Sequence, residues 1–143
     1  MGLKKVDGRL EPCGFFDNDV WVRGIADLLI INRDKEEARI IDYKTGKSSR
    51  YADTKQLALM AACVFRHFPE VKKVKAGLLF VVCEDFIKAE YEAGTGLSIF
   101  SQLDNTLVSR ETAYETGVFN PKQNFTCGKW CPVVSCAHNG RNS

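Results

Sequence analysis

Two short motifs, Gly-Ile-Ala-Asp at residues 24–27 and Ile-Asp-Tyr-Lys-Thr-Gly at residues 41–46, set acidic side chains among apolar and β-branched ones. The first motif lies inside a run over residues 20–31 that predicts one strand, and the second completes a short buried strand over residues 38–43. An extended stretch over residues 3–16 precedes them, and polar turns separate the three runs. Three strands joined by tight turns predict an antiparallel meander.

The remainder of the chain shows helical and strand periodicity. A helix is expected over residues 53–67, then strands over residues 74–83 and 86–93, and an amphipathic helix over residues 97–115. The sequence after residue 117 is irregular and contains three of the six cysteines. This order predicts an α/β or α+β sheet domain with a C-terminal appendage.

Composition narrows the class of protein. A chain of 143 residues suits one domain, and 20 Lys and Arg against 18 Asp and Glu give a net charge of +2, too small for strong nonspecific attraction to nucleic acid. No apolar run reaches the roughly 18–20 residues of a membrane span, and the first residues lack the apolar segment of a signal peptide. We therefore expect a cytoplasmic protein with no membrane partner. Its six cysteines are expected to be reduced, with Cys63 and Cys83 in the core and the others available as metal ligands.

Asp27, Asp42 and Lys44 carry the strongest chemical signal. Because side chains alternate along a strand, Asp42 and Lys44 are expected on one face of the sheet. Two carboxylates beside an ammonium can hold a hard divalent cation, which polarises a phosphoryl oxygen and activates water. The alternative is an exposed Asp42–Lys44 ion pair with Asp27 solvated. The metal site is favoured because both acids interrupt apolar runs, where an uncompensated carboxylate is costly to bury.

These motifs, together with Gln-Leu-Ala-Leu-Met at residues 56–60, resemble the PD-(D/E)XK nuclease superfamily. The likeness is greatest to its RecB-like branch, which includes phage exonucleases and CRISPR-associated nucleases and shows a G-h-h-D strand, a D-Y-K-T-G strand and a helix with Q-h-x-x-Y. The resemblance covers about residues 10–65. It implies a restriction-endonuclease-like fold, with helices flanking a central mixed β-sheet. The nuclease core would occupy residues 1–116, and a cysteine-rich appendage over residues 117–143 would pack on it.

The resemblance also implies roles for individual residues. Asp27 and Asp42 would be ligands of Mg²⁺ or Mn²⁺, and the backbone carbonyl of Tyr43 would be a further ligand. Lys44 would be the catalytic lysine. Gln56 would lie near the metal or the DNA backbone, whereas without the resemblance it would be a solvated helix residue.

Two features depart from the family pattern. Met60 stands where the family has a tyrosine. Only ten residues precede Glu11, whereas many RecB-like nucleases have an N-terminal helix that carries a further ligand. The chain is expected either to be a minimal or truncated version or to receive that ligand from elsewhere. Glu11 lies where family members often have a glutamate, and it is either a support for the metal site or an exposed strand residue. These departures motivate a rival hypothesis, a non-catalytic DNA-binding or recombination accessory protein on the same fold.

A second cluster of candidate ligands lies near the C-terminus and consists of Cys127, Cys131, Cys136 and His138. Three thiols this close in sequence can converge on a soft metal, and with the imidazole they would form a Cys₃His zinc site. The resemblance suggests instead the cysteine triplet of iron–sulfur members of the family, with Cys13 as the upstream fourth ligand. Free thiols in a packed tail are a third interpretation. With zinc bound, the chain could also be a protein-interaction module.

Three basic residues, Lys47, Arg50 and Lys55, lie in the loop after Lys44 and at the start of the next helix. Because this loop must border a metal site at Asp42, we expect these side chains to contact phosphates. The expected function is a divalent-metal-dependent nuclease that hydrolyses phosphodiester bonds in single- or double-stranded DNA. An exonuclease in replication, recombination or repair is favoured, and an endonuclease is the alternative. The resemblance implies a homo-oligomer or a larger recombination complex, and so compact a nuclease would suit a phage-infected or bacterial cell.

Overall fold

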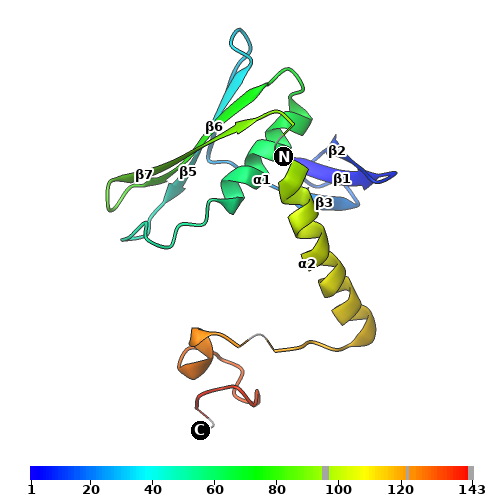
Figure 1. Cartoon of the computed structure of the whole chain (residues 1–143), viewed down its shortest axis with the longest axis vertical. Coiled ribbons are helices and arrows are strands. Elements are labelled where there is room, and N and C mark those ends of the chain that lie inside the picture. Colours follow the sequence, from blue (N-terminus) through cyan, green and yellow to red (C-terminus); the bar gives the residue numbers. More distant parts are fainter. Residues whose placement is uncertain (95–96, 122, 142–143) are drawn as a thin grey trace. The chain divides into compact units, whose positions relative to one another are not determined.

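The computed structural model describes residues 1–94, 97–121 and 123–141 (Figure 1). The chain forms two compact units, Met1–Asp104 and Asn105–Ser143. None of the helices in the described residues is long and apolar enough to span a membrane.

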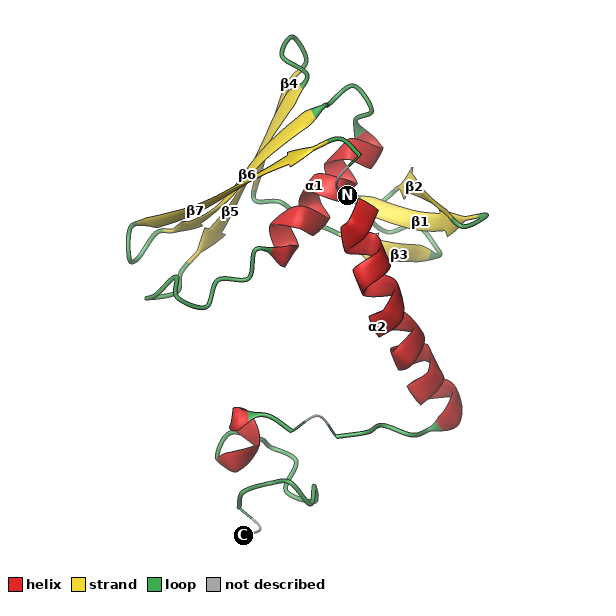
Figure 2. Cartoon of the chain, in the orientation of Figure 1, coloured by secondary structure: helices red, strands yellow, loops and turns green. Residues whose placement is uncertain are grey.

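A three-stranded antiparallel sheet occupies the N-terminal part of the first unit (Figure 2). Strands β1 (Gly2–Val6) and β2 (Arg9–Cys13) form a hairpin around Asp7 and Gly8. Both turn residues have positive φ, 47° and 75°, which a two-residue hairpin turn requires and which Asp-Gly supplies with little strain. Strand β3 (Val20–Arg23) pairs with the other edge of β1, so the order is β2-β1-β3.

A four-stranded mixed sheet forms the rest of the strand structure. Its order is β4-β5-β6-β7, with the strands β4 (Leu28–Asn32), β5 (Glu37–Lys44), β6 (Lys73–Phe80) and β7 (Asp85–Glu92). Strands β5 and β6 are parallel, whereas the outer pairs are antiparallel. Parallel neighbours need a crossover, and helix α1 (Lys55–His67) provides it.

The predicted single strand over residues 20–31 is wrong, because the chain breaks at residues 24–27 and continues in the other sheet. The predicted meander is wrong for the same reason: β3 pairs with β1, and only β4 and β5 form a hairpin. At the break, the Gly24 amide donates a hydrogen bond of 2.9 Å to the Met1 carbonyl. This bond lies outside the hydrogen-bond ladders of the four-stranded sheet. The predicted extended stretch over residues 3–16 is a hairpin of two strands, β1 and β2, and the elements after residue 37 lie within a few residues of their predicted bounds, including α2 (Leu97–Thr116).

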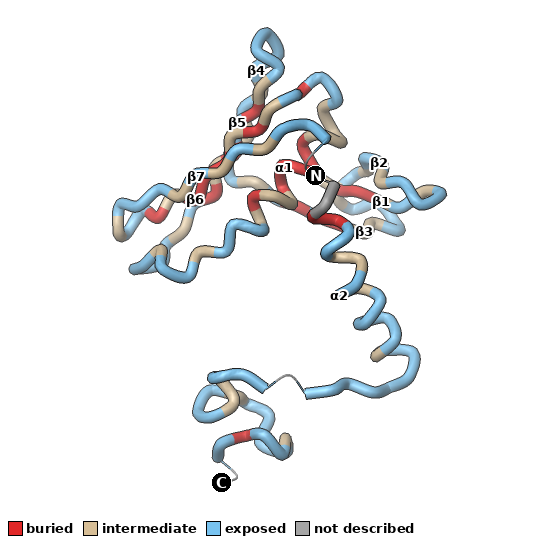
Figure 3. Tube along the Cα trace, in the orientation of Figure 1, coloured by how far each residue is buried: buried red, intermediate tan, exposed pale blue. Residues whose placement is uncertain are grey.

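Helix α1 lies between the two sheets (Figure 3), and its buried residues pack in clusters with both of them. Leu57 and Val64 join a cluster with the four-stranded sheet, whereas Cys63 joins a cluster with the three-stranded sheet and the start of α2. Cys63 is fully buried and Cys83 packs against the first cluster, as expected for core cysteines.

The second unit contains the end of α2, a short 3₁₀ helix, η1 (Phe125–Gly128), and irregular chain. Asn139 is buried there and its side-chain amide donates to the carbonyls of Cys131 and Val133 at 3.1 and 2.9 Å. The Gly140 amide donates to the Cys127 carbonyl at 2.9 Å, which brings both ends of the cysteine-rich segment together.

Candidate active site

Asp42 and Lys44 lie on the same face of β5, as the strand periodicity predicts. The Lys44 Nζ is 2.6 Å from the Asp42 Oδ2. The Asp42 residue is 9% exposed, so the ion pair lies at the edge of the buried region and is not a solvated surface pair. A carboxylate this far from water requires a compensating charge, and Lys44 provides one.

Gln56, the second residue of α1, joins this pair from the neighbouring element. Its Nε2 donates to the Asp42 Oδ2 at 3.4 Å, and its Oε1 accepts from the Lys44 Nζ at 3.2 Å. Three side chains therefore form a closed triangle between the C-terminal end of β5 and the N-terminal end of α1. Each side chain restrains the other two, which holds the ammonium in a defined position.

Asp27 differs from the sequence-based expectation. It is exposed and lies just before β4, so it is not a carboxylate buried within an apolar strand. Leu28 pairs with Ile41, and continuing that register by one residue sets Asp27 opposite Asp42. The Asp27 Oδ2 accepts a hydrogen bond of 2.8 Å from the Tyr43 backbone amide, which ties the two motifs together.

The carboxylate oxygens of Asp27 and Asp42 suit a hard cation that keeps several of its own water ligands. Within the described residues, no group of three or more His, Cys, Asp or Glu could hold a metal ion. Glu11 pairs with Lys4 in the three-stranded sheet and does not join Asp27 and Asp42 in such a group. Mg²⁺ needs only one or two carboxylates, because waters and substrate phosphates complete its coordination. Asp27 and Asp42 meet that requirement without Glu11.

The four C-terminal candidate ligands are not gathered around one point in the described part of the chain. The His138 Nδ1 lies 2.5 Å from the Gln123 Nε2, so the imidazole already has a hydrogen-bond partner. Cys13, the proposed upstream ligand, ends β2 in the other unit. The structure thus gives the zinc and iron–sulfur predictions no geometric support.

The basic residues Lys47, Arg50 and Lys55 are all exposed, on the loop after β5 and at the first position of α1. Ser49 anchors this loop through a hydrogen bond from its hydroxyl to Asp85. The Arg50 guanidinium lies 5.6 Å from the ring of Tyr51, which is 86% exposed. Tyr51 is not among the residues predicted from the sequence to contact nucleic acid. An aromatic side chain beside basic residues in a loop is nevertheless a typical nucleic-acid contact.

Comparison with known proteins identifies the family. The family model described as the PD-(D/E)XK nuclease superfamily matches residues 3–136. The crystal structure of SSO0001 is similar over 96% of this chain and 56% of its own length, with 15% sequence identity and a TM-score of 0.46. The chain thus spans little more than half of that structure. No curated protein sequence matches the chain.

The fold agrees with this family match. In the described residues, two α-helices, a four-stranded mixed sheet and a three-stranded sheet are consistent with the α+β restriction-endonuclease-like fold. Members of the family are nucleases that act on DNA and generally use Mg²⁺ or Mn²⁺. The match covers both sequence motifs and nearly the whole chain, and the chain therefore belongs to the PD-(D/E)XK nuclease superfamily.

Proposed function

We propose that the chain is a divalent-metal-dependent deoxyribonuclease of the RecB-like branch, acting as an exonuclease in replication, recombination or repair. The observation that carries the proposal is the triangle of Asp42, Lys44 and Gln56, with Asp27 tied to the same end of β5. Residues 1–116 form the nuclease core in this proposal, and residues 117–143 form the appendage. A phage or CRISPR-associated source, and work in a homo-oligomer or recombination complex, belong to the same proposal.

In this proposal, Asp27, Asp42 and the Tyr43 carbonyl hold Mg²⁺ or Mn²⁺. The cation, when bound, supplies a water of lowered pKa and polarises a phosphoryl oxygen. The Lys44 ammonium stabilises negative charge that develops on the phosphate, and a preorganised donor of this kind contributes strongly to rate. Gln56 fixes the ammonium through its Oε1.

DNA enters the proposal through the exposed loop after β5. Lys47, Arg50 and Lys55 neutralise phosphates, and binding through such contacts weakens as salt rises. Glu11 lies on another sheet and contributes to the metal site only if the substrate-bound state brings it closer.

A nuclease assay with Mg²⁺ or Mn²⁺ on single- and double-stranded DNA tests the proposal. Asp42→Asn should lower the cleavage rate at least about 10³-fold, because it removes a charged metal ligand and the partner of Lys44. Asp34→Asn is the matched control, because Asp34 is an exposed acid in the turn between β4 and β5. Wild-type activity in Asp42→Asn would contradict the assignment.

The rival function is a non-catalytic DNA-binding or recombination accessory protein. The observation that favours it is the 2.6 Å ion pair, which already neutralises Asp42, together with Met60 at the family's tyrosine position. Calorimetry with Mn²⁺ separates the two functions. Binding that is lost in Asp42→Asn supports the nuclease, and the absence of Mn²⁺ binding supports the rival.

The cysteine-rich segment carries a separate part of the proposal, a structural zinc ion or an iron–sulfur cluster. What motivates it is the sequence alone, which concentrates three thiols and one imidazole within residues 127–138. Metal analysis and the visible spectrum of the purified protein distinguish zinc from iron. A protein purified without either metal would contradict this part alone.

A further inference from the structure

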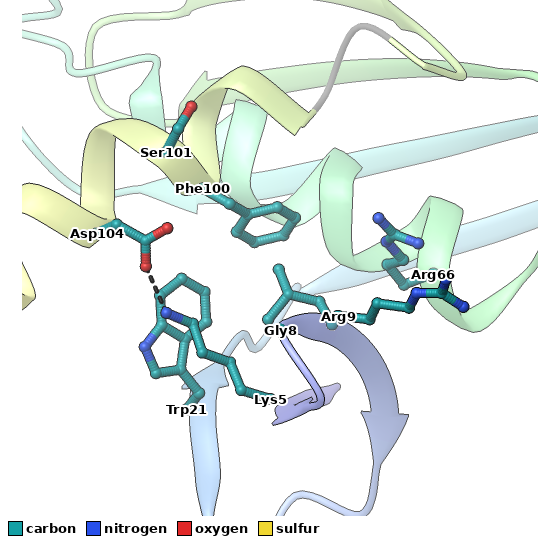
Figure 4. Close-up of a pocket in the computed structure, with 9 residues that line it drawn as sticks. Lys5, Gly8, Arg9, Trp21, Arg66, Phe100, Ser101 and Asp104 are labelled. Atoms are coloured by element: carbon teal, nitrogen blue, oxygen red, sulfur yellow. Dashed lines mark hydrogen bonds and ion pairs between the residues drawn. The ribbon is translucent and has the colours of Figure 1, made fainter.

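A pocket of about 590 Å³ lies at the end of α1 that is remote from the Asp42 site (Figure 4). The three-stranded sheet, α1 and the first turns of α2 line this open pocket, all within the unit Met1–Asp104. The residues that carry its chemistry are Lys5, Arg9, Leu10, Trp21, Arg66 and Phe100. Neither the proposed metal site nor the proposed basic loop contributes to it.

The charged groups of the pocket divide into a neutral pair and two cations. Lys5 is neutralised by Asp104, whose Oδ1 lies 2.5 Å from its Nζ. Arg9 and Arg66 form no ion pair with any carboxylate of the described residues. Figure 4 shows both arginines on the side of the pocket away from the Lys5–Asp104 pair. That side of the pocket therefore carries net positive charge.

Apolar side chains line the space between these groups. The rings of Trp21 and Phe100 lie 5.9 Å apart, and Leu10 completes the apolar lining. The Lys5 ammonium sits 4.3 Å from the centre of the Trp21 ring, which fixes the indole at the pocket wall. Two guanidinium groups beside an aromatic wall match a phosphate and a base of an unpaired nucleotide.

Helix stability explains only part of this arrangement. Arg66 lies in the last turn of α1, where a cation interacts favourably with the helix dipole. Arg9 lies in β2, far away in sequence, and gains nothing from that dipole. Because neither guanidinium has a carboxylate partner in the described residues, an anion in this pocket would interact favourably with both.

The pocket lies where a DNA strand bound at the Asp42 site could also reach it. Gln56 and Arg66 lie on the same helix, and a rise of 1.5 Å per residue separates them by about 15 Å along its axis. At about 3.4 Å per stacked nucleotide, this separation corresponds to four or five nucleotides.

We propose that this pocket binds single-stranded DNA four or five nucleotides from the scissile phosphate, with phosphate on Arg9 and Arg66 and a base against Trp21. The proposal rests on the proposed nuclease function for its substrate. A single strand is specified because a paired base would first have to be unpaired and unstacked, whereas an unpaired base enters the pocket without that cost. The site would hold the substrate strand during successive cleavage steps.

Tryptophan fluorescence tests the proposal directly, because the chain has only two tryptophans. Trp130→Phe leaves Trp21 as the single reporter, and EDTA prevents cleavage during titration with a twelve-nucleotide thymidylate strand. We expect binding to quench Trp21. In that background Arg9→Gln and Arg66→Gln should each weaken binding about tenfold and lower the salt slope by about 0.7. Arg33→Gln is the matched control, because Arg33 is an exposed arginine outside the pocket. This variant should bind the thymidylate strand with the affinity of the parent protein.

Three results would overturn the proposal: unchanged Trp21 fluorescence while a labelled strand binds by anisotropy, equal affinity for thymidine monophosphate, or equal affinity for duplex DNA. Far-UV circular dichroism of each variant establishes that it is folded, and Arg9→Lys should recover most of the lost affinity. Because the titration contains no metal, it is independent of cleavage. A chain that quenches but never cleaves refutes the proposed nuclease alone, and a chain that cleaves without quenching refutes the pocket alone.

Discussion

Within Met1–Asp104, buried apolar side chains form two clusters on either side of α1, whereas within the described part of Asn105–Ser143 the single buried residue is the polar Asn139. Phe125 and Trp130 in the second unit are 90% and 77% exposed. The first unit can therefore hold a carboxylate at the edge of its core in fixed geometry. The second unit depends on backbone hydrogen bonds around one amide, which position side chains less firmly.

The largest effect expected from this difference between the two units is a loss of cleavage on substitution of Lys44 in the first unit. Lys44→Met should lower cleavage at least about 10³-fold, because the positioned ammonium is lost. It should also strengthen Mn²⁺ binding about tenfold, because the ammonium 2.6 Å from Asp42 no longer repels and competes with the cation. Nuclease assays and calorimetry measure the two effects. Lys129 is an exposed lysine of the second unit, and Lys129→Met should change neither the cleavage rate nor Mn²⁺ binding. A similar loss of cleavage in both variants would contradict the difference between the two units.

Core truncation gives the next largest effect. Leu57 is fully buried under the four-stranded sheet, so Leu57→Ala should lower the free energy of unfolding by about 2–5 kcal/mol. Trp130→Ala removes a larger side chain but one that is exposed, and it should cost less than about 0.5 kcal/mol. Urea unfolding followed by circular dichroism measures both. A similar cost for Trp130→Ala would show that the second unit has a core of its own.

Thiol reactivity distinguishes the two units at single residues. Burial raises the pKa of the Cys63 thiol to about 11, so little thiolate exists at pH 8. Cys63 should react with iodoacetamide at least about a hundredfold more slowly than the partly exposed Cys131, as peptide mass spectrometry would show. Equal labelling rates under native conditions would mean that the cluster around Cys63 opens readily.

Loss of the buried amide should affect the second unit alone. Asn139→Ala removes three hydrogen bonds: two that the side-chain amide donates to the Cys131 and Val133 carbonyls, and one that it accepts from the Arg141 backbone amide. Protection of the Cys131 amide against hydrogen exchange should fall about tenfold, whereas the Leu78 amide in β6 should be unaffected. A loss of protection at both amides would indicate that the units unfold together.

The smallest effect expected is a pH dependence on the sheet of the first unit. Hydrogen bonding from Lys75, whose Nζ is 2.5 Å from the carboxylate, holds the pKa of Glu37 below its usual value of 4.5. Because the folded-state pKa is lowered, the stabilisation is complete above about pH 4.5 and is lost as pH falls through the lowered value. Glu37→Gln should therefore show a shallower decline in urea midpoint between pH 5 and 3. An unchanged decline would contradict this assignment.

Much of the fold follows from local patterns. Helical spacing of apolar residues predicts α1 and α2, and alternation predicts β7 and the shared face of Asp42 and Lys44. The break at residues 24–27 could not be found in this way, because an apolar run fits one long strand as well as two short ones. The Asp-Gly turn at Asp7 and Gly8 was a recognisable hairpin signal that the extended interpretation of residues 3–16 missed.

The features of the candidate site also fall into two groups, those that the sequence determined and those that the tertiary structure decided. The sequence alone determined the positions of the acids and the lysine in the two motifs, the strand shared by Asp42 and Lys44, and the family they resemble, since these depend on residue type and on spacing within one segment. Only the tertiary structure decided that Asp27 is exposed, that Gln56 closes a triangle with Asp42 and Lys44, and that Arg9 and Arg66 meet at one pocket. Each of these depends on which segments pair across long separations, and periodicity within a segment carries no information about its partner.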